Sequence, residues 1–158
     1  MAQDVHELIA GLSDLAGRID GDEELASTFL LGLARVALAL ERDPVLRDKT
    51  GMGDFLAATA GDLRGARLGF DLFTYETRSR LDELLDPGAW IAISRRRSAL
   101  QFLHDLYAGA PLADELPSLD ELDERLRERC GGEGFLEPHE IPEGTPDSHW
   151  WWWCPRTA

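Results

Sequence analysis

The residue types best suited to metal chemistry are gathered near the C-terminal end of the chain. Both cysteines and two of the four histidines lie there, and they are Cys130, His139, His149 and Cys154. Two thiolates and two imidazoles suit tetrahedral zinc. Their spacing, C-x8-H-x9-H-x4-C, lacks the two close pairs with which zinc modules chelate the ion. The first interpretation is therefore ordinary side chains in a loop, and a structural zinc site is the second.

A catalytic centre has weaker support. Either cysteine could act as a nucleophile with His104, His139 or His149 as its base, but no motif fixes such a pair in space. The sequence contains no phosphate-binding loop, dinucleotide fingerprint or Gly-x-Ser-x-Gly motif. We therefore expect a protein that is not an enzyme and that carries no cofactor.

The most distinctive feature is a run of four tryptophans directly after His149. Trp150, Trp151, Trp152 and Trp153 can each bury roughly 150–250 Å², and tryptophan is enriched at binding hot spots. In an extended segment, successive side chains point to opposite sides, so both sides need apolar cover. This favours insertion into a groove. We predict that His149 and the four tryptophans bind a partner, with packing on the protein's own helices as the alternative.

The charge distribution narrows the choice of partner. The chain carries a net charge of −14, and residues 109–149 hold twelve Asp or Glu against three Arg. Like-charge repulsion disfavours direct binding to nucleic acid or to an anionic membrane surface. The partner we expect is another protein, larger and with a basic surface, or a second copy of this chain.

The elements that must position these residues are helices. Apolar side chains recur at helical spacing through residues 1–130 and predict one compact all-α bundle of five to six helices. We expect helices over residues 4–19, 22–42, 86–107 and 118–130, and one long or two shorter helices over 54–85. The helix over 22–42 is the most apolar and should be central. Asp86-Pro87 should begin a helix, and Ser118 with Glu121 should form a capping box.

Two patterns within the helices have open interpretations. Gly61, Gly65 and Gly69 lie four residues apart, so they predict close approach of a neighbouring helix, or else of a ligand or partner. The triplet at residues 95–97 is all arginine and is typical of a solvated face. A basic spot that receives the molecule's own acidic segment is the alternative.

Residues 131–158 show no helical period and are rich in proline and glycine. Proline and glycine impose an extended, turn-rich path. We therefore divide the chain into a helical bundle domain, residues 1–130, and an irregular C-terminal arm, residues 131–158, that packs on the body or on a partner.

These observations favour a non-enzymatic protein-interaction subunit. An accessory, adaptor or inhibitor protein of the immunity type, including one from a bacterial conflict or defence system, would dock through its acidic segment and its tryptophan-rich tail. The alternative is a ligand- or zinc-responsive regulatory domain with the arm as its lid. The start of the chain has no signal-peptide pattern and no apolar stretch is long enough to span a bilayer, so a cytoplasmic location is expected.

Overall fold

The computed structural model describes residues 2–46, 51–83, 86–130 and 136–153. These residues contain helices and no strand, so the predicted all-α fold is confirmed. The α-helices are α1 (Ala2–Ala16), α2 (Glu23–Arg42), α4 (Met52–Arg64), α5 (Arg67–Arg80), α6 (Pro87–Leu106) and α7 (Asp120–Arg129). Three short 3₁₀ helices follow α6 or lie in the arm, and they are η1 (Pro111–Glu115), η2 (Pro138–Glu140) and η3 (Trp150–Trp152).

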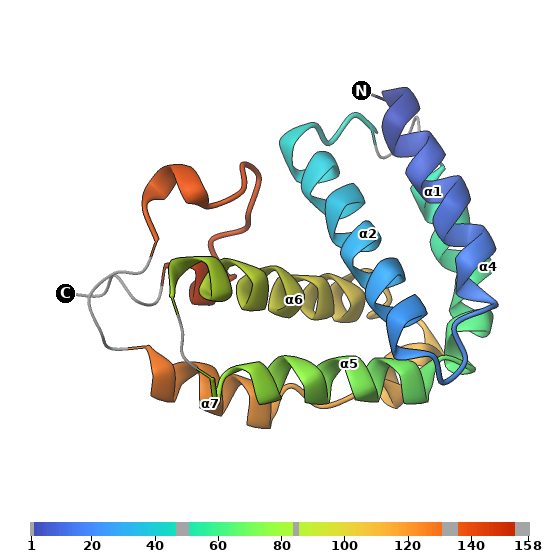
Figure 1. Cartoon of the computed structure of the whole chain (residues 1–158). Coiled ribbons are helices and arrows are strands. Elements are labelled where there is room, and N and C mark those ends of the chain that lie inside the picture. Colours follow the sequence, from blue (N-terminus) through green and yellow to red (C-terminus); the bar gives the residue numbers. More distant parts are fainter. Residues whose placement is uncertain (1, 47–50, 84–85, 131–135, 154–158) are drawn as a thin grey trace.

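Helix α2 occupies the centre of the molecule, as predicted. The Asp22 carboxylate accepts a hydrogen bond from the Leu25 amide and so caps the first turn. The helix packs against α1, α5 and α6 (Figure 1). Its apolar face is fully enclosed, and the residues with no exposed surface include Phe29, Leu30, Leu33 and Val36.

Helix α6 begins where the sequence predicts it. The Asp86 carboxylate accepts from the Ala89 amide at 2.7 Å, and Pro87 takes the first helical position. Its apolar face is buried in the core, where Trp90, Leu100 and Leu103 have no exposed surface. Four polar residues in the middle of the same helix are buried as well, and they are Ser94, Arg96, Arg97 and Ser98.

The segment predicted as one long or two shorter helices is two, because α4 ends at Gly65 and α5 begins at Arg67. The prediction of close approach holds at Gly69, where an added Cβ would lie 3.0 Å from the Asp20 carbonyl oxygen. It is wrong at Gly61, whose added Cβ would meet open space. Gly65 serves as the end of α4 and has only that helix's own Asp62 carbonyl nearby.

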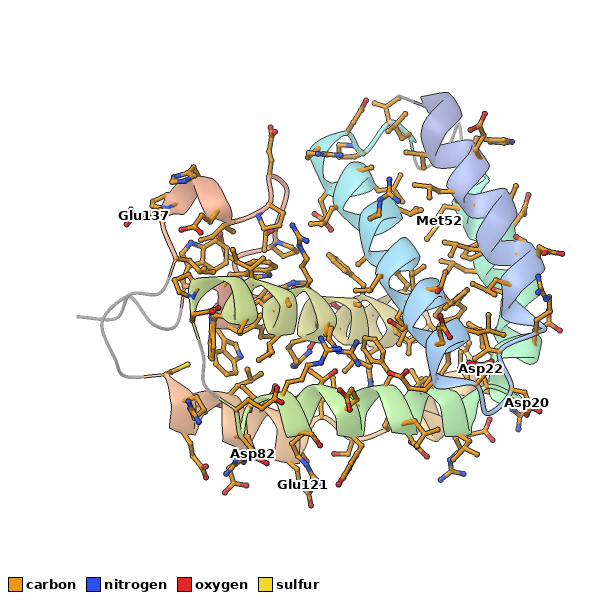
Figure 2. All side chains as sticks on the ribbon, viewed as in Figure 1. Asp20, Asp22, Met52, Asp82, Glu121 and Glu137 are labelled. Atoms are coloured by element: carbon orange, nitrogen blue, oxygen red, sulfur yellow. The ribbon has the colours of Figure 1, made fainter. Side chains whose placement is uncertain are left out.

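Helix α7 lies beside α5 at the edge of the molecule (Figure 1). The predicted capping box is wrong, since Leu119 occupies the N-cap and makes no side-chain cap. The helix is joined to α5 and the residues after it by the ion pairs Arg78–Glu121 and Arg125–Asp82. Figure 2 labels Glu121 and Asp82 along this edge.

The described part of the arm, residues 136–153, folds back over the helices (Figure 1). Gly144 has a φ of +90°, which disfavours a side chain, and an added Cβ would lie 2.9 Å from the Leu38 carbonyl oxygen. The arm is therefore packed against the last turns of α2. Near the end of the described arm, the Trp151 carbonyl accepts a hydrogen bond from the Trp90 indole at 2.9 Å, and this bond joins the arm to α6.

Candidate functional site

The tryptophan run is a 3₁₀ turn, not an extended strand. In a 3₁₀ helix side chains at i and i+3 eclipse, so Trp150 and Trp153 share one side and the two between them turn inward. Trp151 and Trp152 are each 1% exposed, Trp150 is half-buried and Trp153 is 36% exposed. The extended conformation assumed for the run is therefore wrong. For the inner two tryptophans the structure shows the alternative, packing on the protein's own helices.

One serine of α6 holds this turn. The indole N–H groups of Trp151 and Trp152 donate to Ser98 Oγ at 3.0 and 2.8 Å. The third partner of Ser98 Oγ is His149 Nδ1, at 2.9 Å. An indole N–H can only donate, and a hydroxyl has two acceptor sites and one proton. The Ser98 hydroxyl must therefore donate to His149 Nδ1, and all three of its hydrogen-bonding positions are used within the protein.

The protonation state of His149 follows from this arrangement. Because Nδ1 accepts, the neutral ring carries its proton on Nε2, which is buried without a hydrogen-bond partner among the described residues. Burial, followed by the charge of Arg97, lowers the pKa of His149 to about 4. Serine and histidine are in contact here, but the hydroxyl is fully engaged by other groups and the imidazole is a weak base. The arrangement is suited to holding the arm.

We expect the protein to lose stability as the pH falls towards 5. In the folded state His149 stays neutral down to about pH 4, whereas in the unfolded chain it binds a proton below about pH 6.5. The unfolded state binds more protons in that window, so the free energy of unfolding falls as the pH is lowered. Between roughly pH 7 and pH 5 the loss should be about 2 kcal/mol. Urea unfolding at several pH values, followed by tryptophan fluorescence, measures it.

The matched control for this prediction is His149→Asn. The amide oxygen of asparagine can accept from Ser98 and does not titrate, so this variant should show a smaller pH dependence. Burial also lowers the pKa of His104, and that contribution remains in the variant. Equal pH dependence in both proteins would show that His149 is not responsible.

The arginine triplet does not form a solvated face, and this prediction is wrong for two of its members. Arg95 is exposed, whereas Arg96 is 5% and Arg97 is 3% exposed. Arg97 binds both carboxylate oxygens of Asp123, at 2.6 and 3.0 Å, and its guanidinium lies 4.1 Å from the Trp151 ring centre. Asp123 belongs to the acidic segment, residues 109–149. At Arg97 the structure therefore shows the alternative, a basic spot that receives this segment.

Arg96 is held by a separate set of groups on α5. Its guanidinium donates to Thr77 Oγ1 at 2.8 Å and to the Phe73 carbonyl at 3.2 Å, and it stacks on the Phe73 ring. Burial, followed by the charge of Arg80, lowers its pKa to about 10. It therefore stays charged at neutral pH and joins α6 to α5 and, through an ion pair with Glu23 at 3.5 Å, to the start of α2.

A cavity of about 400 Å³ lies where α2, α6 and the arm meet. Most of its lining is apolar and comes from α2 and from the arm, including Leu31, Leu38, Pro142 and Trp152. Ser98 borders it beside Trp152, and the guanidinium-bearing side chains of Arg35 and Arg95 complete the lining. The cavity is thus enclosed partly by the same segment that the Ser98 hydrogen bonds hold in place.

The four predicted zinc ligands are not assembled in the described part of the chain. His149 is buried with Nδ1 occupied, whereas His139 is exposed on η2. Cys130 is disulfide-bonded, so it offers no thiolate, and Cys154 lies outside the described residues. Among residues 2–46, 51–83, 86–130 and 136–153 no three His, Cys, Asp or Glu side chains could hold a metal ion. Zinc binding by the complete set stays a prediction, and it requires that the Cys130 disulfide be reduced.

An apolar stripe on the outer face of α5 is a second candidate site. Leu68, Leu72 and Tyr75 lie at i, i+4 and i+7, so they share one side of the helix. They are 59%, 40% and 60% exposed. Tyr75 is within 5.3 Å of the Arg78 guanidinium, which in turn pairs with Glu121 of α7. We call Leu68, Leu72 and Tyr75 the α5 ridge.

Sequence reasoning missed both Ser98 and the α5 ridge. The ridge had a signal: Leu68, Leu72 and Tyr75 form a second apolar stripe, offset from the one that contains Phe70 and Phe73. Ser98 had a weaker one, a polar residue within the apolar pattern of α6. Nothing in the sequence indicated its three partners, because they lie about fifty positions away.

No protein-family model, curated protein or solved structure matches this chain. In the part of the chain that the structure describes, no helix is long and apolar enough to cross a membrane.

Proposed function

We propose that this protein is a non-enzymatic interaction subunit, of the accessory, adaptor or inhibitor type, that docks onto another protein through the α5 ridge. The observation that carries the proposal is the exposure of three large apolar side chains on one side of a single helix. Single exposed apolar residues are normal, but a contiguous patch is typical of an interaction site. Tyrosine adds a large, rigid contact surface of the kind enriched at binding hot spots.

The neighbouring helix supplies the charge for this docking surface. Four acidic residues of α7 are exposed, and they are Asp120, Glu121, Glu124 and Glu128. Through the Glu121–Arg78–Tyr75 contacts this acidic face is continuous with the α5 ridge. A partner that fits both has an apolar groove with a basic rim, and the net charge of −14 would steer it into place. The same charge disfavours nucleic acid and anionic membranes.

The tryptophan tail has a different role in this proposal from the one the sequence predicts. His149, Trp151 and Trp152 are each 1% exposed and hold the arm to α6. They are not available to a partner while the arm is closed. Trp153, at 36% exposure, and the half-buried Trp150 are the members of the run that a partner could contact directly.

The experiment replaces the α5 ridge and compares it with an equally exposed residue elsewhere. We expect the combined variant Leu68→Ser, Leu72→Ser and Tyr75→Ser to lose the partner that the wild-type chain retains from lysate of cells that make it. Val45→Ser removes an apolar side chain that is 58% exposed and should bind normally. With purified partner, the ridge variant should raise the dissociation constant at least about tenfold.

Two further measurements distinguish a basic partner protein from a second copy of this chain. Binding that weakens as salt is raised supports a basic partner. Light scattering of the wild-type chain alone tests the second-copy alternative, because a dimer that the ridge variant converts to a monomer would make the partner another copy. Undiminished binding by the ridge variant would contradict the proposal.

The disulfide at Cys130 bears on where this function is carried out. Disulfides persist in oxidising compartments and are rare in the reducing cytosol. This counts against the cytoplasmic location expected from the sequence. We propose that the protein works in an oxidising compartment, where this disulfide persists. Thiol labelling of the protein in intact cells should then leave Cys130 unlabelled, and labelling of Cys130 would contradict the proposal.

The second candidate function, a ligand-responsive regulatory domain with the arm as its lid, is favoured by one observation. The cavity of about 400 Å³ is bounded by the arm on one side and by α2 and α6 on the other.

A further inference from the structure

The cavity beneath the arm has the size and lining of a small-molecule site. Its volume of about 400 Å³ lies within the range of ligand pockets, which are mostly apolar with a few polar groups that orient the ligand. The side chains of Leu31 and Leu38 line it from α2, and Pro142 and Trp152 line it from the arm. Such walls suit a hydrocarbon or aromatic group.

The polar groups of this cavity are two arginines on different helices. Arg35 of α2 and Arg95 of α6 both line it, and both are exposed, so they lie on its solvent side. Within the described residues neither forms an ion pair. Seven other arginines do, and they are Arg18, Arg64, Arg78, Arg80, Arg96, Arg97 and Arg125. In a chain with 30 acidic and 16 basic residues, this apolar cavity is lined by two arginines without an ion pair and, among the described residues, by no Asp or Glu.

We propose that this cavity binds a small amphipathic carboxylate. The carboxylate lies between Arg35 and Arg95, which donate charge-assisted hydrogen bonds to it. The apolar tail lies along Leu31 and Leu38 and against the Trp152 ring. This inference is independent of the proposed docking at the α5 ridge.

Occupancy of the cavity is coupled to the arm. Pro142, Thr145 and Trp152 of the arm line the cavity together with residues of α2 and α6. A ligand that contacts both sides binds the closed arm better than an open one, so it shifts the arm towards the closed state. The ligand should therefore slow amide hydrogen exchange in residues 142–152 as well as change the fluorescence of Trp152.

The experiment uses the full chain with decanoate as the probe, below its micelle concentration. We expect saturable binding of one decanoate per chain by calorimetry, with slowed exchange in the arm. Decanol has the same tail without the charge, and acetate has the charge without the tail. Both should bind about tenfold more weakly or worse.

Charge-removing variants locate the binding site. Arg35→Gln and Arg95→Gln should each weaken decanoate binding by about tenfold, and circular dichroism checks that they remain folded. Arg67→Gln removes an exposed arginine of α5 that does not line this cavity and should bind as the wild type does. The proposal is overturned if decanoate does not bind saturably, if decanol binds as well as decanoate, or if Arg67→Gln weakens binding as much as the other two variants.

Discussion

Replacing Ser98 by alanine is expected to free the C-terminal arm from α6 and to lower the free energy of unfolding by roughly 3–9 kcal/mol. The substitution leaves the indole N–H groups of Trp151 and Trp152 and the Nδ1 atom of His149 without their partner. Each orphaned buried group costs about 1–3 kcal/mol. Small domains are stable by only about 5–15 kcal/mol, so this one hydroxyl accounts for a large share of the total.

The same helix provides the control for this prediction. Ser94 lies one turn before Ser98 and has no exposed surface, and its hydroxyl has no hydrogen-bond partner among the described residues. Ser94→Ala should therefore be neutral or slightly stabilising. Urea unfolding gives the stability change, and hydrogen exchange over residues 136–153 shows whether the arm opens first. Both are recorded with and without reductant, because Cys130 is disulfide-bonded. Equal behaviour of the two alanine variants would rule out Ser98 as the group that holds the arm.

The elements predicted best are those determined by neighbouring residues. An aspartate cap followed by a long apolar stripe located the starts of α2 and α6, because both signals lie within one or two turns. The N-cap of α7 was misplaced by one residue, at Ser118 instead of Leu119, for the same reason, since Ser118 and Glu121 match a capping box locally. The structure instead has the Ser118 hydroxyl accepting from the Asp120 amide at 3.3 Å.

The site was predicted less well because its contacts are distant in the sequence. The burial of Arg97 depends on Asp123, and that of Arg96 depends on Thr77. From the sequence alone the triplet at residues 95–97 shows only three charges on a helix, for which a solvated face is the usual outcome. The cavity could not be predicted either, since its walls come from α2, α6 and an arm whose path is set by turns.

The tryptophan run shows how a small conformational choice changes a functional interpretation. An extended strand would have displayed two tryptophans on each side and required two covering surfaces. The 3₁₀ turn places Trp151 and Trp152 together on α6, so one body is enough. The three side chains of the α5 ridge are each more exposed than any of the four tryptophans, and their spacing is visible in the sequence.

Replacing Asp123 by asparagine is expected to cost about 3–5 kcal/mol of stability. Arg97 is 4% exposed at its side chain and binds both oxygens of this carboxylate. Asparagine leaves the guanidinium buried and without its counter-charge, and that uncompensated charge is what makes a broken buried pair costly. Because Arg97 also stacks on Trp151, the loss should loosen both α7 and the arm. Urea unfolding together with hydrogen exchange over both segments measures this.

Two comparisons separate the buried charge from a general effect of removing a carboxylate. Asp14→Asn breaks the Arg18–Asp14 pair, whose side chains are 63% and 77% exposed, and should cost less than about 1 kcal/mol. The double variant Arg97→Met and Asp123→Leu removes both charges and keeps apolar volume. It should recover most of the loss, since a buried ion pair adds little net stability over a well-packed apolar pair. If the double variant is instead as unstable as Asp123→Asn, the specific geometry of the pair is essential to the fold, beyond neutralisation of the buried arginine.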